Sequence, residues 1–199
     1  FHQFICYKLY KIEKMNQTAL VVIKSMGIGD LCILIANIHA ISKSTNKPLV
    51  VLAQKSTHAS SILKYDPHVK EVIELDKKGF FNVVKKINPY KIHQAYIFSD
   101  SIRLYLISKL SNIEQIFHYK FFSKRGKNFF KTAKEFTEQI LNTKIDTQSK
   151  IYCDKNDIDN AKRKYNITSA TKNYIIAPSA SGPTKRWPIS NFIKLLEEL

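Results

Sequence analysis

The chain of 199 residues has few cysteines, few acidic residues and no long apolar run. Its three cysteines, Cys6, Cys32 and Cys153, are odd in number and far apart, so neither a disulfide framework nor a zinc site is expected. The six histidines also lack the spacings of metal ligands. No apolar run reaches the roughly 18–20 residues that span a bilayer, and the first residues are a poor signal peptide. We therefore expect a cytoplasmic protein without a bound metal.

The scarcity of acidic residues leaves a large positive charge. Only 16 Asp and Glu stand against 32 Lys and Arg, for a formal net charge of +16. Such a surplus favours acidic partners, namely nucleic acid, an anionic membrane surface or phosphorylated molecules. No RRM or KH signature is present, which counts against a nucleic-acid module.

Short apolar runs alternate with stretches of helical periodicity. Strands are predicted at residues 19–23, 49–53, 71–75, 94–98 and 114–118. Helices are predicted from the glycine turn to about residue 44 and at 60–65, 80–87, 101–110 and 128–141. This alternation is typical of a parallel, doubly wound α/β sheet. The aromatic residues of the last helix, Phe129 and Phe136, are expected in the core.

The polar stretch 142–150 is predicted to be a linker between two domains. After it the α/β pattern restarts, with strands expected at 151–153 and 174–177 and helices near 157–165 and from about 190. The first domain is then 15–141 and the second 151–199. Because Met15 stands just before the first strand, residues 1–14 are expected to lie outside the fold, and the chain is expected to be an N-terminal fragment.

The stretch SMGIGD follows the first strand and carries Gly27, Gly29 and Asp30. A dinucleotide-binding loop is a poor explanation, because its third glycine is replaced by Cys32 and Asp30 would repel a pyrophosphate. Two interpretations remain for the acid. One is that its carboxylate caps the following helix. The other, which the first does not exclude, is that it is a general base at the edge of the sheet where ligands bind.

A second stretch, IIAPSASGPTKRWPIS, joins the predicted strand 174–177 to the last helix. Ser181 and Thr184 offer hydroxyl donors, Gly182 permits close backbone approach and Lys185 supplies a cation, as in a phosphate-binding loop. The alternative is an ordinary loop that Trp187 anchors by packing.

The GD turn, followed in the next α/β unit by TKRWPISNF, resembles glycosyltransferase family 9, the lipopolysaccharide heptosyltransferases. The resemblance covers about residues 17–199. It implies a GT-B fold, with two Rossmann-like domains of which the second is truncated here. The first domain would bind the acceptor and the second the nucleotide sugar. Asp30 would be the catalytic base, and Lys185 would contact the donor diphosphate beside Thr184.

The resemblance implies an inverting, metal-independent glycosyltransferase at the inner membrane surface, with ADP-heptose as donor and an acidic glycolipid, the lipopolysaccharide core, as acceptor. The chain departs from the family pattern at Ala36, at Pro178-Ser179 and at Phe98-Ser99-Asp100-Ser101. The second departure affects the donor loop, and the third affects the identity of the acceptor. A transferase of another sugar is one alternative, and a non-catalytic protein that binds nucleic acid or a membrane surface is the other.

Weaker candidates complete the site. The acceptor would be gripped by four cations, which are Arg103, Lys124, Arg125 and Lys127, although a run of charge is more often a solvated loop. His39, His58 and His68 are expected to be surface or packing residues. If Asp30 is not the base, Asp100 is the next candidate.

Overall fold

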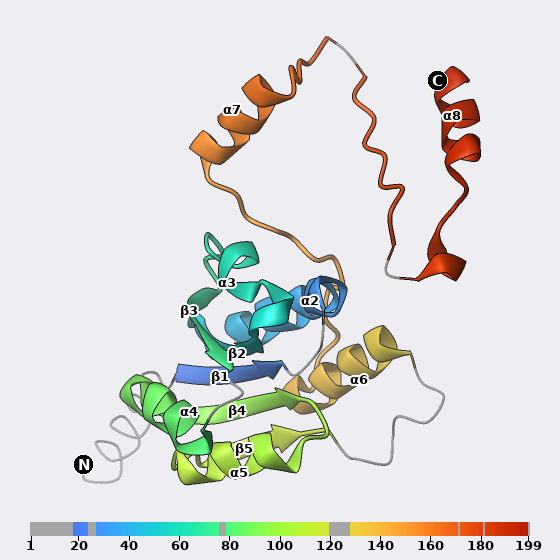
Figure 1. The fold of residues 1–199 in the computed structure, drawn as a ribbon. Coiled ribbons are helices and arrows are strands. Elements are labelled where there is room, and N and C mark those ends of the chain that lie inside the picture. Colours follow the sequence, from blue (N-terminus) through green and yellow to red (C-terminus); the bar gives the residue numbers. More distant parts are fainter. Residues whose placement is uncertain are drawn as a thin grey trace, which may run out of the picture. The chain divides into compact units, whose positions relative to one another are not determined.

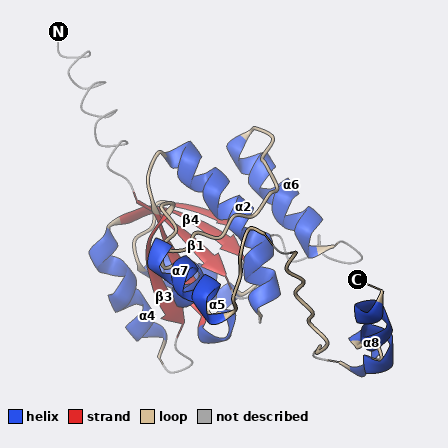
Figure 2. Ribbon diagram, turned by 90° about the horizontal axis from the view of Figure 1, so that it is seen from above, coloured by secondary structure: helices blue, strands red, loops and turns tan. Residues whose placement is uncertain are grey.

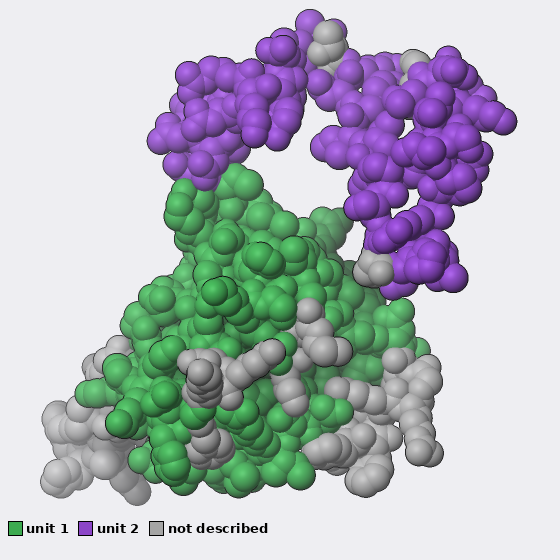
Figure 3. All heavy atoms as spheres, in the orientation of Figure 1, with its two compact units in different colours: residues 1–153 green, residues 154–199 purple. Residues whose placement is uncertain are grey.

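A computed structural model describes residues 18–23, 27–75, 79–119, 128–170, 172–180 and 182–198. The chain divides into two compact units, residues 1–153 and residues 154–199 (Figure 3). The expected extension at residues 1–14 lies outside the described residues.

Unit 1 contains a parallel sheet of five strands in the order β3-β2-β1-β4-β5 (Figure 1). The strands are β1 (Thr18–Ile23), β2 (Leu49–Gln54), β3 (Val69–Leu75), β4 (Ile92–Phe98) and β5 (Gln115–His118). All five strands expected from the apolar runs are confirmed, and no end moves by more than two residues. The order runs outward in both directions from β1 and β4, as in a doubly wound sheet.

Helices cover both faces of this sheet. They are α2 (Ile28–Thr45), α3 (Ala59–Ile62), α4 (Phe80–Ile87), α5 (Ile102–Leu110) and α6 (Phe129–Leu141), with single 3₁₀ turns at Lys55–Thr57 and Asn88–Tyr90. On one face Val21 and Ile23 belong to the core that includes α2 and α6, while Leu20 and Val22 face α4 and α5. Because successive strand residues point to opposite faces and both faces are covered, residues 19–23 of β1 are all apolar and buried.

Helices α2 and α6 pack side by side on one face of the sheet (Figure 2). Between them the Thr137 hydroxyl donates to Asn37 Oδ1 at 2.8 Å, and both side chains are buried. Phe136 contacts Phe98 and Tyr119 edge-to-face, with ring centroids 5.2 and 4.7 Å apart. The predicted core role of this aromatic stripe is therefore confirmed.

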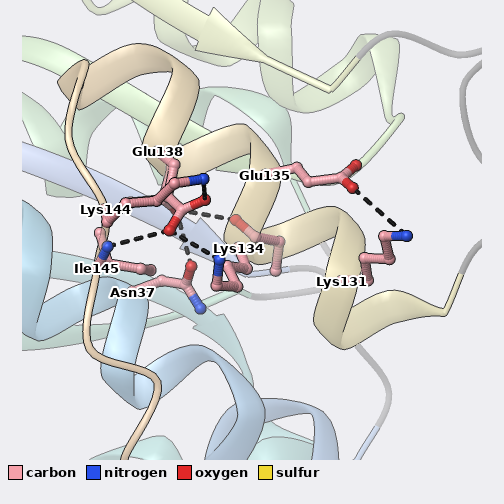
Figure 4. Close-up of polar contacts among 9 residues, drawn as sticks. Asn37, Lys131, Lys134, Glu135, Glu138, Lys144 and Ile145 are labelled. Carbon is pink, nitrogen blue, oxygen red and sulfur yellow. Dashed lines mark hydrogen bonds and ion pairs between the residues drawn. The ribbon is translucent and has the colours of Figure 1, made fainter.

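The chain that follows α6 is held against unit 1. Glu138 accepts hydrogen bonds from Lys134 at 2.8 Å, from the Ile145 N–H at 3.1 Å and from Lys144 at 3.3 Å (Figure 4). The Lys134 hydrogen bond is the main cause that lowers the pKa of Glu138 to about 2. Further on, the Ser149 hydroxyl donates to the Cys32 carbonyl at 2.6 Å. Residues 142–150 thus belong to unit 1, and their role as a linker stays a prediction.

Unit 2 contains α7 (Lys155–Lys164), a 3₁₀ turn at Pro183–Lys185 and α8 (Ile189–Glu197). The strands predicted at 174–177 and at 151–153, which belongs to unit 1, were wrong: both segments are described, and neither forms a strand. A strand forms only by hydrogen bonding to a neighbour, and the described part of unit 2 contains no strand with which residues 174–177 could pair. Ile175 is accordingly 97% exposed.

Candidate active site

The carboxyl ends of β1 and β4 lie side by side at one edge of the sheet. These strands are parallel neighbours, and their ends are paired in register at Ile23 and Phe98. From β1 the chain proceeds outward to β2 and β3, whereas from β4 it proceeds outward to β5. The carboxyl edge between them is therefore the topological switch point, which is the usual ligand position in open α/β sheets.

Asp30 lies at this switch point, in the first turn of α2. It is the third helical residue, and the residue that caps the helix is Gly27, with no side-chain hydrogen bond. The interpretation of Asp30 as the cap was thus wrong, because a cap must precede the first helical residue. Asp30 is half-buried, and its position in the first turn still puts a negative charge near the positive end of the helix dipole.

The two turn glycines are open to their surroundings. A Cβ built on Gly27 or Gly29 meets no atom within 4 Å, apart from chain neighbours, among the residues that the structure describes. No packing contact within the described part of the chain therefore requires glycine at these two positions.

The loop after β4 brings Asp100 and Arg103 to the same edge. Ser99 is buried, and its hydroxyl accepts a hydrogen bond from the Ser101 N–H at 3.2 Å just before α5 begins. Arg103 is exposed in the first turn of α5. The sheet order therefore places the predicted base, its alternative Asp100 and one predicted acceptor cation at neighbouring strand ends. The other three acceptor candidates, Lys124, Arg125 and Lys127, lie outside the described residues.

The predicted donor loop belongs to unit 2. Gly182 precedes the 3₁₀ turn that contains Thr184 and Lys185, and the Lys185 N–H donates to the Gly182 carbonyl at 3.1 Å. Both side chains are exposed, as a ligand contact requires. Trp187 packs edge-to-face on Phe192 of α8 at 4.9 Å between ring centroids, a contact that agrees with the packing role expected for it. Ser181 lies outside the described residues.

His39 and His68 form a separate cluster at the opposite edge, where β3 begins. His39 is buried, with its Nε2 2.7 Å from Asp66 Oδ2. The centroid of the His68 ring lies 4.5 Å from that of the His39 ring, and the His68 ring also contacts Tyr152. Two causes lower the pKa of His68 below 6.5: its burial is the larger, and the charge of the neighbouring His39 is the second. These contacts confirm a packing role for His39 and His68, while His58 is exposed in a left-handed conformation.

Two further features bear on ligands. A pocket of about 390 Å³ lies between α2 and the chain after α6, lined among others by His39, Lys43, Lys144 and Asp146, and it includes no predicted site residue. Among the described residues no three His, Cys, Asp or Glu side chains gather as a metal would require. Nor does any described helix have the length and apolarity to cross a bilayer.

The comparisons with known proteins bear on the fold. No family model matches the sequence, and no curated protein matches it. Among solved structures, the chain resembles the crystal structure of the glycosyl transferase family 9 protein from Veillonella parvula DSM 2008, with a TM-score of 0.68 and 17% identity. The match covers 91% of this chain and 59% of that one. At this identity the likeness shows the fold, and the expected α/β, Rossmann-like fold class is confirmed.

Proposed function

We propose that the protein is part of a glycosyltransferase that moves a sugar from a nucleotide-sugar donor to an acceptor hydroxyl. The observation that carries the proposal is the position of Asp30 at the switch point between β1 and β4. A carboxylate there can take a proton from a bound hydroxyl, whereas it would repel the phosphates of a dinucleotide. The fold shared with a family 9 glycosyl transferase supports the same reaction class.

In the proposed step Asp30 accepts the proton of the acceptor hydroxyl. The acceptor oxygen forms a bond to the anomeric carbon, and the bond from that carbon to the nucleoside diphosphate breaks with its electron pair on the diphosphate. Because the attack is in line and direct, the configuration inverts. Lys185, helped by Thr184, stabilises the charge that develops on the leaving diphosphate, so the proposal invokes no metal ion. Ser181 and Gly182 complete this donor loop.

ADP-heptose is the proposed donor, and a phosphorylated glycolipid of the lipopolysaccharide core is the proposed acceptor. The net charge of +16 supports an acidic acceptor. Arg103 is proposed as one acceptor contact, which the start of α5 directly after the β4 loop supports. We propose Lys124, Arg125 and Lys127 as further acceptor contacts, and the inner face of the cytoplasmic membrane as the place of reaction.

The chain spans about three fifths of the matched structure, so the test uses the full-length protein. It is incubated with inner-core glycolipid and a panel of ADP-, UDP- and GDP-linked sugars, and products are identified by mass spectrometry. We expect transfer from ADP-heptose, with an inverted linkage by NMR. Transfer from another donor would change the sugar only. Absence of transfer from every donor, together with salt-dependent RNA binding, would favour the non-catalytic alternative.

The donor loop has its own test. Lys185→Ala should weaken binding of the nucleotide sugar about 10- to 150-fold, the range for one charge-assisted hydrogen bond. Lys185→Arg should restore part of it, because a planar guanidinium replaces a compact ammonium poorly. The matched control is Lys194→Ala, because Lys194 is likewise an exposed lysine of unit 2, on α8. Unchanged donor affinity in Lys185→Ala, measured by calorimetry, would make the loop purely structural.

A further inference from the structure

Helix α5 is apolar on both sides. Leu104 and Ile107 face the core and are buried. Ile102, Leu106 and Leu110, spaced i, i+4 and i+8, share the outward side of the helix, and they are between 47% and 61% exposed. A helix on the surface of a globular protein normally carries polar residues there. We therefore expect that a binding partner covers this apolar stripe.

The neighbouring helix α4 adds to the same surface. It packs on the same face of the sheet as α5 and contacts it (Figure 1). Its first turn exposes Phe81, which is 71% accessible, whereas Val83 and Val84 of the same helix are buried. Tyr105 of α5, partly exposed, adds an amphipathic ring with the Lys109 ammonium 5.9 Å from its centroid.

The charges on these two helices have one sign. Lys85 and Lys86 of α4 and Arg103 and Lys109 of α5 are all exposed. Neither helix contains Asp or Glu. The outward surface of α4 and α5, which we call the α4–α5 face, thus combines large apolar side chains with four cations.

We propose that the α4–α5 face docks on an anionic membrane surface. Apolar side chains enter the boundary between head groups and acyl chains, while lysines and arginines contact lipid phosphates. A second copy of this chain fits less well, because pairing the face with itself would oppose four cations to four cations. Nucleic acid also fits less well, since Ile and Leu side chains do not stack on bases as aromatic rings do.

The position of this face agrees with a lipid-linked acceptor, a step that rests on the proposed function. Parallel strands place the start of each following helix at the carboxyl edge of the sheet. Ile102 therefore lies directly after the loop of Asp100, at the edge that also holds Asp30. A membrane on the α4–α5 face would present its head groups next to the proposed base.

The test is sedimentation of the purified protein with vesicles of phosphatidylglycerol and phosphatidylcholine, in the absence of donor and acceptor. Wild-type protein should bind these vesicles, bind pure phosphatidylcholine poorly and lose affinity as salt rises. Lys85→Gln with Lys86→Gln should lower the partition coefficient about 25-fold, at about fivefold for each cation removed. The double substitution Leu106→Gln with Leu110→Gln should also lower the partition coefficient, by roughly threefold to tenfold for each half-exposed leucine that is replaced.

Helix α7 offers matched controls of the same chemistry. Lys155→Gln with Lys162→Gln removes two exposed cations, and Ile158→Gln removes an apolar side chain that is 42% exposed. Neither should change vesicle binding by more than about twofold, if binding depends on the α4–α5 face. Circular dichroism and thermal melting confirm that every variant is folded.

Three results would overturn the proposal. One is an absence of binding to anionic vesicles. Another is an equal loss in the α7 controls, which would mean that total charge alone drives binding. The third is a dimer by light scattering that the Leu106 and Leu110 substitutions convert to a monomer, which would assign the face to a second copy. Transfer to a deacylated, soluble acceptor should survive these leucine substitutions, so failure of docking and failure of the proposed function are distinguishable.

Discussion

Replacing Asp30 by asparagine separates catalysis from stability. Asparagine has nearly the same shape but cannot accept the proton of an acceptor hydroxyl. Because Gly27 caps α2, the change removes no capping hydrogen bond. Only the favourable interaction of one carboxylate with the helix dipole is lost.

Both effects have a magnitude. A first-turn carboxylate contributes about 0.3–1 kcal/mol, which for a protein of this size corresponds to a melting temperature lower by roughly 1–4 °C. General-base catalysis contributes about 10²–10⁴-fold in rate, or roughly 2.7–5.5 kcal/mol of activation free energy. The loss in turnover should therefore greatly exceed the loss in stability, with donor affinity nearly unchanged.

Asp157 supplies a matched control, because it is likewise the third residue of its helix, α7. Asp157→Asn removes the same charge from the same helical position and should leave turnover unchanged. The assays are turnover of the full-length protein at saturating donor and thermal melting of each variant. Near-normal turnover in Asp30→Asn would refute the base assignment and direct attention to Asp100. An equal loss of turnover in Asp157→Asn would show that helix electrostatics, not proton transfer, explain the effect.

Three predictions concern the stability of unit 1. Thr137→Val should leave the buried Asn37 side-chain carbonyl without its donor, which costs about 1–3 kcal/mol or roughly 2–12 °C in melting temperature. Thr137→Ser keeps a hydroxyl and should preserve the hydrogen bond. Equal melting temperatures of the two variants would contradict this prediction. Since burial lowers the pKa of His68 below 6.5, the native state binds fewer protons there than the unfolded chain. The free energy of unfolding should thus fall as pH decreases through 6.5. His68→Gln should reduce the change of the denaturation midpoint between pH 7 and pH 5, and an unchanged pH dependence would contradict this role of His68. Glu138→Gln should speed proteolytic cleavage of the segment after α6, unlike Glu135→Gln on the exposed side, and equal cleavage rates would show that Glu138 does not hold the segment.

The elements of unit 1 follow from local rules that the sequence states directly. Strands that are buried on both faces consist mainly of apolar residues, so β1 and β2 can be recognised in the sequence as continuous apolar runs. A helix of one buried stripe shows a period of 3.6, which located α6 and its core residues Ala133 and Phe136. The identity of the candidate base also came from the sequence, as an acid in the turn after the first strand.

The tertiary structure decided what depends on partners distant in the chain. Strand order cannot be derived from local pattern, and that order makes the turn of Asp30 and the loop of Asp100 neighbours at a switch point. The apolar run at 174–177 shows the reverse case: its local pattern is that of a strand, yet it pairs with no strand among the described residues and forms none itself. Likewise, the sequence allowed Asp30 to be a cap, and only the start of α2 at Ile28 excluded it. Pairing, burial and helix starts are collective properties, because each depends on contacts that the local sequence does not contain.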